Sequence, residues 1–532
     1  MHVPKLFLIL ILAGSLVGCT VTGNNGGTNV SDASTAPGPI TIDWKPQNDA
    51  PVENDSPVIK ELERLFNVKF NFIYMNRNKE TELLNVRIAS GAIPDVMVLH
   101  EDQYRSYIRQ GTLLEIQEAF LKERAPAMYG LVIKNAGEAT WNFAKENGKL
   151  YGIPILDPYG EYPFIPIWRD DWLRNVGIGK IPETLEEAET AFYKFARENP
   201  DKNEEKDTYA LSDTGMGPIF GAFGGIPYFS AGGGNVFTWT VRDGKAVATA
   251  VLPEMKEALL LLNKWYKAGL IDPEFINGES KGQYWGSSVT FWNGKIGFSC
   301  PGQFYHINPP LNDRDAGSNN YLNFKKVLGE YVSYVPGKPI KGPGGKSGTE
   351  CWGVVSGYYL VLGKNVSKTE GKLEKIIEIT EKLVSDFEVN KLAVFGIEGA
   401  TYEIVDGNYT LIGGASTIEG MAGLGIAAEG IGQIAANNIE FYRNTRKSYF
   451  EYGDKLDGLL TGYTNSIRYD LPSNGQYRDI INRMIRESYA LFISGEKSPD
   501  DFDRFVQELN EAGLSQLTKE ADEWYQKHAG QS

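Results

Sequence analysis

The sequence of 532 residues predicts an α/β protein with a largely parallel sheet and at least two domains. Two observations support this class. Short strand patterns recur between segments with helical periodicity. About 490 residues follow a polar N-terminal stretch, which is more than one hydrophobic core usually holds. No repeat of fixed period is visible, and this argues against a solenoid.

Three strand patterns stand near the start of the body, separated by helical segments. The strand patterns lie at 40–44, 68–74 and 93–99. Between the first two, residues 56–66 carry one apolar stripe at helical spacing, with Ser56 as the predicted N-cap. Because strands alternate with helices here, we expect the strands to pair in parallel.

The same alternation returns further along the chain. Helices are predicted at 185–197, 253–268 and 370–387, and short buried strands at 294–298 and 358–362. The last hundred residues have mainly helical patterns. The later half therefore continues the α/β class.

The N-terminus has the pattern of a secretory signal. Lys5 precedes an apolar run at 6–17 that is too short to span a bilayer as a helix. The run ends in LVGC at 16–19, which is similar to a bacterial lipobox. We therefore expect 1–19 to be a lipoprotein signal peptide and Cys19 to receive a diacylglyceryl anchor. The alternative is an ordinary secretory signal with a chance cysteine.

Residues 20–39 are mostly Gly, Asn, Ser and Thr and contain little that can be buried. Such a segment is a flexible tether with a reach of about 25 Å. No later segment approaches eighteen consecutive apolar residues, so we expect the body to be held at the membrane by acyl chains alone.

The composition of the chain argues against some classes of function. The net charge of −15 argues against a nucleic-acid partner, which needs a basic face. After lipidation only Cys300 and Cys351 remain. Either one disulfide or two free buried thiols is compatible with the sequence.

Nine segments in a fixed order carry a family resemblance. They are ASGAIPDVMV (89–98), GTLLEI (111–116), GKLYGIPI (148–155), IWRDDWLRNVGI (167–178), PET (182–184), LNKWYKAGLIDPEF (262–275), GKIGF (294–298), FGIEGATYE (395–403) and GEKSPDDFDRFVQELNEAGL (495–514). Together they resemble the extracellular solute-binding lipoproteins for sugars and oligosaccharides. The most similar branch includes the alginate-binding and glycosaminoglycan-disaccharide-binding proteins.

The resemblance implies a two-lobe, periplasmic-binding-protein-like fold of type II. Both lobes are discontinuous in sequence and joined by crossover hinge segments. We expect the first lobe at 40–165 and 295–397, and the second at 166–294 and 398–532. The expected crossings lie near 164–169, near 294–301 and near 396–402.

The function implied by the resemblance is transport, without catalysis. A carbohydrate is captured in the interlobe cleft, the lobes close over it, and the loaded protein meets the permease subunits of an ABC importer. We expect an extracytoplasmic monomer that is attached to the cell membrane by its lipid.

Sugar sites need aromatic faces for the ring and planar polar groups for the hydroxyls. The resemblance places stacking aromatics at Trp285 and at the loop that carries Phe304 and Tyr305, where a tryptophan is common in the family. The alternative for each of these residues is a place in the hydrophobic core. Trp352 is a further aromatic candidate.

Three other residues complete the predicted ligand site. Glu398 stands where the family places an acid facing the ligand, and its alternative is a turn cap. Arg169 offers a planar guanidinium for hydroxyls or a sugar acid, and its alternative is an ion pair with Asp170 or Asp171. Tyr402 is the last candidate.

A structural Ca²⁺ site is predicted after the helix at 185–197. Oxygen-bearing residues alternate there as in EF-hand-type loops. The resemblance implies that four residues supply side chains and that Glu205 supplies its carbonyl: Asn199, Asp201, Asn203 and Asp207. Glu204 and Thr208 depart from the pattern, since they replace the usual Gly and the closing acid. The alternative is a solvated polar turn.

Enzyme motifs are absent from the sequence. It contains neither G-x-S-x-G nor H-E-x-x-H, and His100, His306 and His528 are far apart along the chain. Two classes stay open as alternatives. One is a surface-anchored glycoside hydrolase or lyase, which needs only two carboxylates. The other is a peptide- or signal-binding lipoprotein of the same fold.

Overall fold

The computed structural model describes residues 38–76, 79–203, 205, 207–229, 236–277, 288–312, 315–458, 460–467 and 471–528. The chain divides between residues 39 and 40, and the description below concerns residues 40–532. Cys19 and Trp285 lie outside the described residues. In the part of the chain that is described, no helix is long and apolar enough to cross a membrane.

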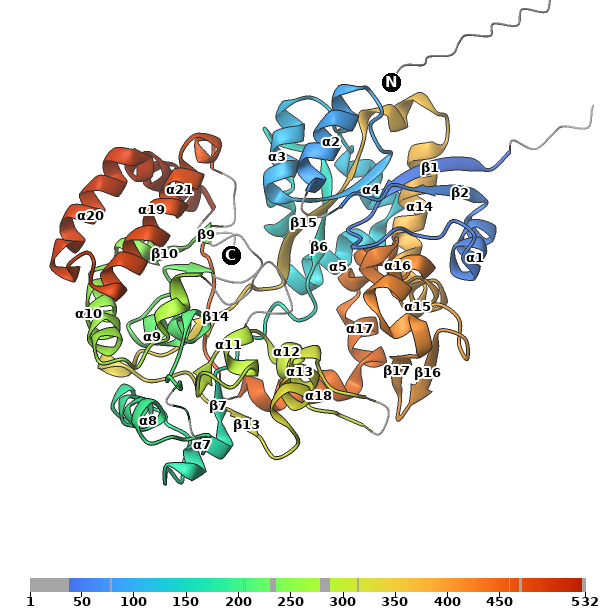
Figure 1. Ribbon diagram of the computed structural model, residues 1–532. Helices are drawn as coiled ribbons and strands as arrows, with labels where there is room; N and C mark the ends of the chain where they lie inside the picture. The colour runs from blue at the N-terminus through green and yellow to red at the C-terminus, as the bar shows by residue number, and fades with distance from the viewer. Residues whose placement is uncertain are drawn as a thin grey trace, which may run out of the picture. The chain divides into compact units, whose positions relative to one another are not determined.

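A five-stranded sheet forms the centre of the first part of the fold (Figure 1). Its order is β2 (Val68–Phe72), β1 (Ile40–Lys45), β3 (Val96–His100), β15 (Val355–Leu362) and β6 (Gly152–Leu156). β1 pairs in parallel with both of its neighbours. β15 comes from much later in the chain and runs antiparallel between β3 and β6. The predicted strands at 40–44, 68–74, 93–99 and 358–362 are all present.

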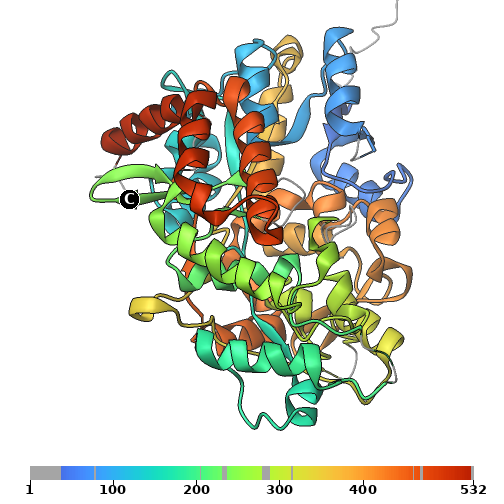
Figure 2. The ribbon, with the colours of Figure 1, turned by 60° about the vertical axis from the view of Figure 1, so that its left-hand side comes forward.

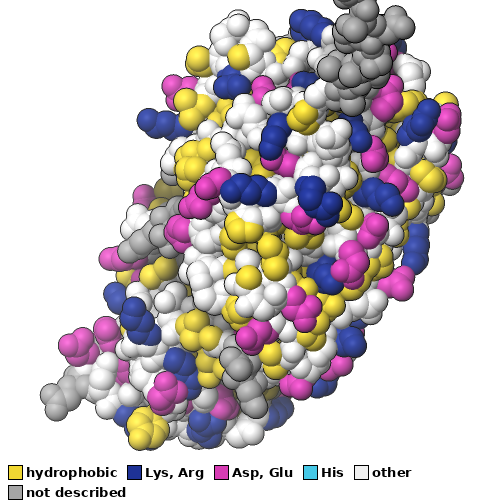
Figure 3. Space-filling view, turned by 90° about the vertical axis from the view of Figure 1, so that its right-hand side faces the viewer, with side chains coloured by type: hydrophobic (Ala, Val, Ile, Leu, Met, Phe, Trp, Pro, Cys, Tyr) yellow, Lys and Arg dark blue, Asp and Glu magenta, His cyan; other side chains and the backbone are white. Residues whose placement is uncertain are grey.

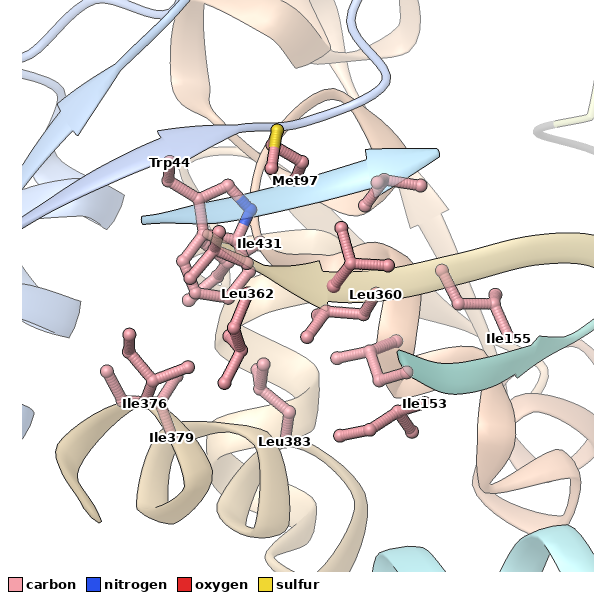
Figure 4. Close-up of a cluster of buried hydrophobic side chains, with 14 of the residues drawn as sticks. Trp44, Met97, Ile153, Ile155, Leu360, Leu362, Ile376, Ile379, Leu383 and Ile431 are labelled. Atoms are coloured by element: carbon pink, nitrogen blue, oxygen red, sulfur yellow. The ribbon is translucent and has the colours of Figure 1, made fainter. Parts of the chain in front are cut away.

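Helices cover this sheet and complete the first hydrophobic core. Leu360 and Leu362 of β15 face Ile376 and Leu383 of α14 (Figure 4). The predicted N-cap is also present, since Ser56 Oγ accepts a hydrogen bond from the Ile59 N–H at 3.1 Å. The helices around this core are α1 (Pro57–Phe66), α2 (Glu80–Ala89), α3 (Glu101–Arg109), α4 (Glu118–Arg124), α5 (Pro126–Ala136), α6 (Thr140–Phe143), α14 (Lys372–Ser385), α15 (Phe387–Phe395) and α16 (Ile418–Leu424).

The second hydrophobic core is mainly helical. Figure 2 shows the C-terminal helices, in red, beside α10, in green. Its small sheet has the order β12 (Phe298–Ser299), β7 (Ile167–Arg169) and β13 (Tyr334–Pro336), and both pairings are antiparallel. In the two larger sheets, parallel pairing therefore occurs among β1, β2 and β3, and the other described pairings of these sheets are antiparallel. The helices here are α7 (Asp170–Asn175), α8 (Leu185–Arg197), α9 (Met216–Ala222), α10 (Pro253–Lys267), α19 (Asn474–Ser494), α20 (Phe502–Leu509) and α21 (Ser515–His528).

A third, smaller cluster of buried aromatic side chains includes Tyr162, Phe291, Phe304 and Phe450. It joins short helices from distant parts of the chain: α11 (Val289–Trp292), α12 (Phe304–Ile307), α13 (Asn319–Leu328), α17 (Ile439–Thr445) and α18 (Lys447–Asp457). Among the described residues, four short antiparallel strand pairs lie outside these two sheets: β4 (Lys145–Glu146) with β5 (Lys149–Leu150), β8 (Tyr228–Phe229) with β9 (Val236–Phe237), β10 (Trp239–Arg242) with β11 (Lys245–Ala248), and β16 (Tyr402–Val405) with β17 (Asn408–Leu411).

The chain passes between the first and second cores three times, at 157–166, 341–358 and 436–466. The first passage overlaps the range 164–169, near which one crossing is expected, at residues 164–166. The other two differ from the expectation, because Phe298 and Ile340 pack in the second core and Ile426 to Ala435 pack in the first. The hydrophobic cores thus divide residues 295–397 and 398–532 at points other than the predicted lobe boundaries.

The three crossing segments are hydrogen bonded to one another. The Phe164 N–H donates to the Glu350 carbonyl at 2.8 Å, and the Cys351 N–H donates to the Tyr463 carbonyl at 3.0 Å. The second contact belongs to the parallel pair of β14 (Thr349–Glu350) and β18 (Gly462–Tyr463). A Cβ at Gly462 would lie 2.6 Å from the Cβ of Cys351, so the close approach of these segments requires glycine.

Candidate ligand site at the crossings

Three strands have one end each at the same edge of the first sheet. β3 ends at His100, Asp157 follows β6, and β15 begins at Val355. Tyr358 of β15 pairs with His100 in the strand register, and the two rings are 5.2 Å apart. In open α/β sheets, ligands bind outside the carboxyl ends of the strands. This edge is therefore the place where the fold favours a ligand.

Asp157 presents a carboxyl group at this edge. Its Oδ1 accepts a hydrogen bond from the Tyr159 N–H at 2.9 Å, and its own N–H donates to the Val354 carbonyl at 2.7 Å. The side chain is half-buried. Burial raises the pKa of Asp157 to about 6. A carboxyl that is poorly solvated yet still accessible is well suited to accept hydrogen bonds from a ligand.

Asp213 is a second half-buried carboxyl group of raised pKa, and it lies in the second core. It lies in the 3₁₀ turn Asp213–Gly215, is half-buried, and has its pKa raised to about 6 by burial. The next residue, Thr214, shares hydrogen bonds with the hydroxyl groups of Ser299 at 2.7 Å and Ser288 at 3.2 Å. Within the described residues, neither Asp157 nor Asp213 forms an ion pair. Sequence analysis missed both residues.

β12 and the loop after it link the residues near Asp213 to the residues near Asp157. Ser299 contacts Thr214, and a few residues later Gln303 Nε2 donates to the carbonyl of Tyr159 at 2.6 Å. The Gln303 N–H donates to Nδ1 of His306 at 3.0 Å. Burial lowers the pKa of His306 to about 3, so its imidazole is neutral at physiological pH. This loop is thus held rigidly against the first crossing.

The two aromatic candidates of this loop differ in burial. Phe304 has no exposed surface and packs against Tyr162, with ring centroids 4.8 Å apart. Tyr305 is half-buried, and its ring lies 4.7 Å from the ring of Tyr159, which is also half-buried. Phe304 therefore belongs to the core in this structure, whereas Tyr305 retains solvent-exposed surface.

Trp352 also retains surface near the crossings. It is half-buried, its Nε1–H donates to Glu350 Oε1 at 2.7 Å, and its ring lies 5.4 Å from that of Phe164. Since Phe164 and Tyr159 belong to one crossing segment, the structure places Trp352 and Tyr305 against the same stretch of chain.

The remaining predicted residues lie elsewhere. Arg169 is 2% exposed and pairs through two hydrogen bonds with Asp171, at 2.8 and 2.6 Å, as its structural alternative predicted. Tyr402 is 1% exposed and stacks on Tyr409 in the first core. Arg169 and Tyr402 therefore have no surface to offer a ligand here. Glu398 is exposed, with Oε2 3.5 Å from the Tyr402 hydroxyl.

The predicted calcium loop is made of polar side chains that contact each other. Asn199 donates to the Asn203 carbonyl at 2.7 Å, Asn203 donates to Asp201 at 2.7 Å, and the Glu205 N–H donates to Asn203 Oδ1 at 2.7 Å. Asp207 is half-buried at the end of the loop. Carboxylate and amide oxygens suit Ca²⁺. In the ranges that the structure describes, no group of three or more His, Cys, Asp or Glu side chains is assembled around a metal position.

Both remaining cysteines are buried free thiols. Burial raises the pKa of Cys300 well above its ordinary value, so this thiol is unreactive at neutral pH. Cys351 lies in the second crossing, with Sγ 3.4 Å from the Gly160 carbonyl. The sequence left open either one disulfide or two free thiols, and the structure contains the free thiols.

Two side-chain contacts join the first core to the C-terminal helices of the second. Arg478 of α19 pairs with Asp102 of α3 at 2.5 Å. Phe143 of α6 stacks on Trp524 of α21, with ring centroids 5.6 Å apart. These contacts lie outside the three crossing segments, so the two cores touch at the crossings and again at these helices.

A pair of α/β units joined by three crossing segments is the fold of the solute-binding proteins of ABC transporters, and the solved structures bear this out. The alginate-binding protein AlgQ2 matches with a TM-score of 0.65 and 17% identity, covering 92% of this chain and 99% of that chain. The S. pneumoniae substrate-binding protein FusA, in complex with kestose, matches with a TM-score of 0.65 and 15% identity, over 92% and 100%.

Two curated relatives come from Bacillus subtilis (strain 168). The polygalacturonan/rhamnogalacturonan-binding protein YtcQ is 23% identical over 99% of this chain and 99% of its own length. Lipoprotein LipO is 24% identical over 88% and 89%. No family model matches the chain. Acidic and basic side chains are interspersed on the face shown in Figure 3.

Proposed function

We propose that this protein is the substrate-binding component of an ABC importer. It captures a carbohydrate, in particular an oligosaccharide, between its two lobes and delivers it to the membrane permease. The observation that supports the proposal is a set of half-buried carboxyl and aromatic side chains at and beside the crossings. Asp157 and Trp352 lie in crossing segments, and Tyr305 packs on Tyr159 of the first crossing. Asp213 lies in the second core, where its neighbour Thr214 contacts Ser299 of the segment that leads to Tyr305. The fold and the named relatives support this assignment.

The chemistry of these groups suits a sugar. Carboxylates accept hydrogen bonds from hydroxyl groups, and the faces of Tyr305 and Trp352 suit the apolar C–H surface of a pyranose ring. Trp285 and Glu398 remain proposed ligand residues beside them. The contacts of Arg478 with Asp102 and of Phe143 with Trp524 correspond to a closed form, in which the lobes exclude water from the ligand.

The proposed location is the outer face of the cell membrane, with the protein attached through a lipid on Cys19. Residues 20–39 serve as the tether, and the protein acts as a monomer with the permease subunits as partners. The similarity to a protein named as a lipoprotein supports this arrangement. A Ca²⁺ ion bound by Asn199, Asp201, Asn203, Asp207 and the carbonyl of Glu205 would stabilise the loop after α8. Some structural neighbours are named for calcium or for an EF-hand variant.

A binding screen tests the transport function against the enzymatic alternative. Isothermal titration of the purified protein with a panel of oligosaccharides should show saturable binding to at least one member. The same mixtures, incubated overnight, should contain no new reducing ends. Formation of new reducing ends would favour the glycoside hydrolase, for which two carboxyl groups of raised pKa such as Asp157 and Asp213 would supply acid and base. Binding of peptides alone would favour the peptide-binding alternative.

A further inference from the structure

The ion pair between Asp102 and Arg478 joins the two cores at a distance from the three crossing segments. Asp102 belongs to the first turn of α3 in the first core, and Arg478 belongs to α19 in the second. Asp102 Oδ1 and Arg478 Nη1 are 2.5 Å apart. Because a contact of this length exists only while the two helices are close, separation of the cores breaks it.

Asp102 also contacts a histidine of its own core. His100 is the last residue of β3, and its Nδ1 lies 3.5 Å from Asp102 Oδ2, whereas Arg478 contacts the other carboxylate oxygen. The His100 side chain is 48% exposed, so protons reach it from solvent. One carboxylate is therefore shared between a cation of the second core and an imidazole that can take up a proton near neutral pH.

The charges around His100 act in two directions. Burial opposes its protonated form, but the hydrogen bond and charge of Asp102, together with the charge of Glu101, outweigh burial and hold the pKa of His100 above its ordinary value. The charge of Arg478 acts against this rise in the pKa. The ring of Tyr358 in β15 packs on the imidazole, with centroids 5.2 Å apart. Of these groups, only Arg478 comes from the second core.

We propose that His100, Asp102 and Arg478 form a pH-sensitive contact between the lobes, which holds them together while His100 is neutral and weakens when His100 is protonated. A protonated imidazole attracts the carboxylate and repels the guanidinium. When the lobes separate, Arg478 leaves, while Asp102 and Glu101 stay beside His100, so the pKa of His100 rises further. The open form therefore binds the proton more tightly, and acidification shifts the equilibrium towards it.

The consequence for ligand binding rests on the proposed function. A ligand held between the lobes binds the closed form, so its apparent affinity falls with the closed fraction. The fall occurs as the pH drops from about 8 through the raised pKa of His100. Its size is limited, because the side chains of Asp102 and Arg478 are 42% and 22% exposed. Ion pairs that water reaches in this way change an equilibrium by about twofold to fivefold.

The test first measures the lobes directly, in the protein without ligand. Spin labels on Val86→Cys in α2 and Ser515→Cys at the start of α21 report the distance between the two lobes. Both positions are exposed, and the native thiols of Cys300 and Cys351 are buried. A Cys19→Ser background leaves the two introduced thiols as the accessible ones. The distribution of distances gives the ratio of closed to open form.

Between pH 8.5 and pH 6.5 this ratio should fall by about twofold to fivefold in the otherwise unchanged chain. His100→Gln should remove that pH dependence. Arg478→Gln should lower the ratio at pH 8.5 by a similar factor and also lose the pH dependence, whereas Arg478→Lys keeps the charge and should retain a large part of both. Arg483→Gln makes the same change of net charge at an exposed position of α19 and should leave the pH dependence intact.

A ratio that is the same at both pH values overturns the inference, and so does a pH dependence that His100→Gln retains in full. Titration with the panel of oligosaccharides then keeps this result separate from the proposed function. Any member that binds should bind more weakly at pH 6.5 by the same factor, and equal affinities at both pH values contradict the link to binding. If no carbohydrate binds while the ratio still follows His100, the proposed function fails and the pH-sensitive contact stands.

Discussion

The neutral, buried imidazole of His306 makes stability depend on pH in a calculable way. Burial lowers the pKa of His306 from its ordinary value of 6.5 to about 3, and its Nδ1 accepts the Gln303 N–H. The unfolded chain therefore takes up a proton on this residue before the folded protein does. Its contribution is fully present above pH 6.5 and is lost as the pH falls from about 6.5 towards 3.

The expected magnitude follows from the shift. Each pKa unit corresponds to about 1.4 kcal/mol, and pH 5 lies about 1.5 units below the unfolded pKa, so the loss at pH 5 is about 2 kcal/mol. Urea unfolding followed by tryptophan fluorescence at pH 7.5 and pH 5 measures it. Replacing His306 by Gln removes the titrating group and keeps an acceptor within the side chain.

The comparison of wild type with His306→Gln isolates this effect. Asp157 and Asp213 titrate in the opposite sense, because their raised pKa values make the folded protein bind protons more readily than the unfolded chain, but both proteins contain them. The wild type should lose about 2 kcal/mol more than the variant between the two pH values. Equal losses in both proteins would refute the assignment of a neutral buried imidazole. His528→Gln serves as a control at a half-buried position near the C-terminus.

Three further predictions concern the anchor, the calcium loop and the aromatic pair. Cys19→Ser should move the protein from the membrane fraction to the medium or leave an uncleaved precursor. An unchanged membrane fraction with no lipid label on either form would contradict the lipid anchor. A chelator should lower the melting temperature, and the double variant Asp201→Ala with Asp207→Ala should do the same. An unchanged melting curve would mean that the loop is only a polar turn. Phe304→Ala should cost about 3–5 kcal/mol of stability as a core cavity. Tyr305→Ala should instead weaken carbohydrate binding by about 1–3 kcal/mol at nearly unchanged stability, and the reverse pattern contradicts their placement.

Local patterns in the sequence determined the individual elements of this protein. The N-cap at Ser56 depends on a hydroxyl within three residues of its partner. The helices α8 and α10 begin and end almost where the periodicity of 185–197 and 253–268 predicts. The order of nine short motifs was enough to predict the class of fold that the solved structures share. All of these depend on residues that are near neighbours in the chain.

Only the tertiary structure decided how distant segments combine. β15 inserts between β6 and β3, both of which precede it by about two hundred residues or more, and no local pattern encodes such partners. The burial of Phe304 beside the accessible Tyr305 depends on Tyr159 and Tyr162 of the first crossing.

The two carboxyl groups of the candidate site also depend on the tertiary structure and could not be identified from local patterns in the sequence. Asp157 directly follows the buried strand β6, and this position is the one sequence feature that could have pointed to it. Asp213 has no such feature, because its raised pKa comes from protein that folds around it from other parts of the chain. A single aspartate is common in any sequence, and its solvation is set by residues that only the folded chain brings near it.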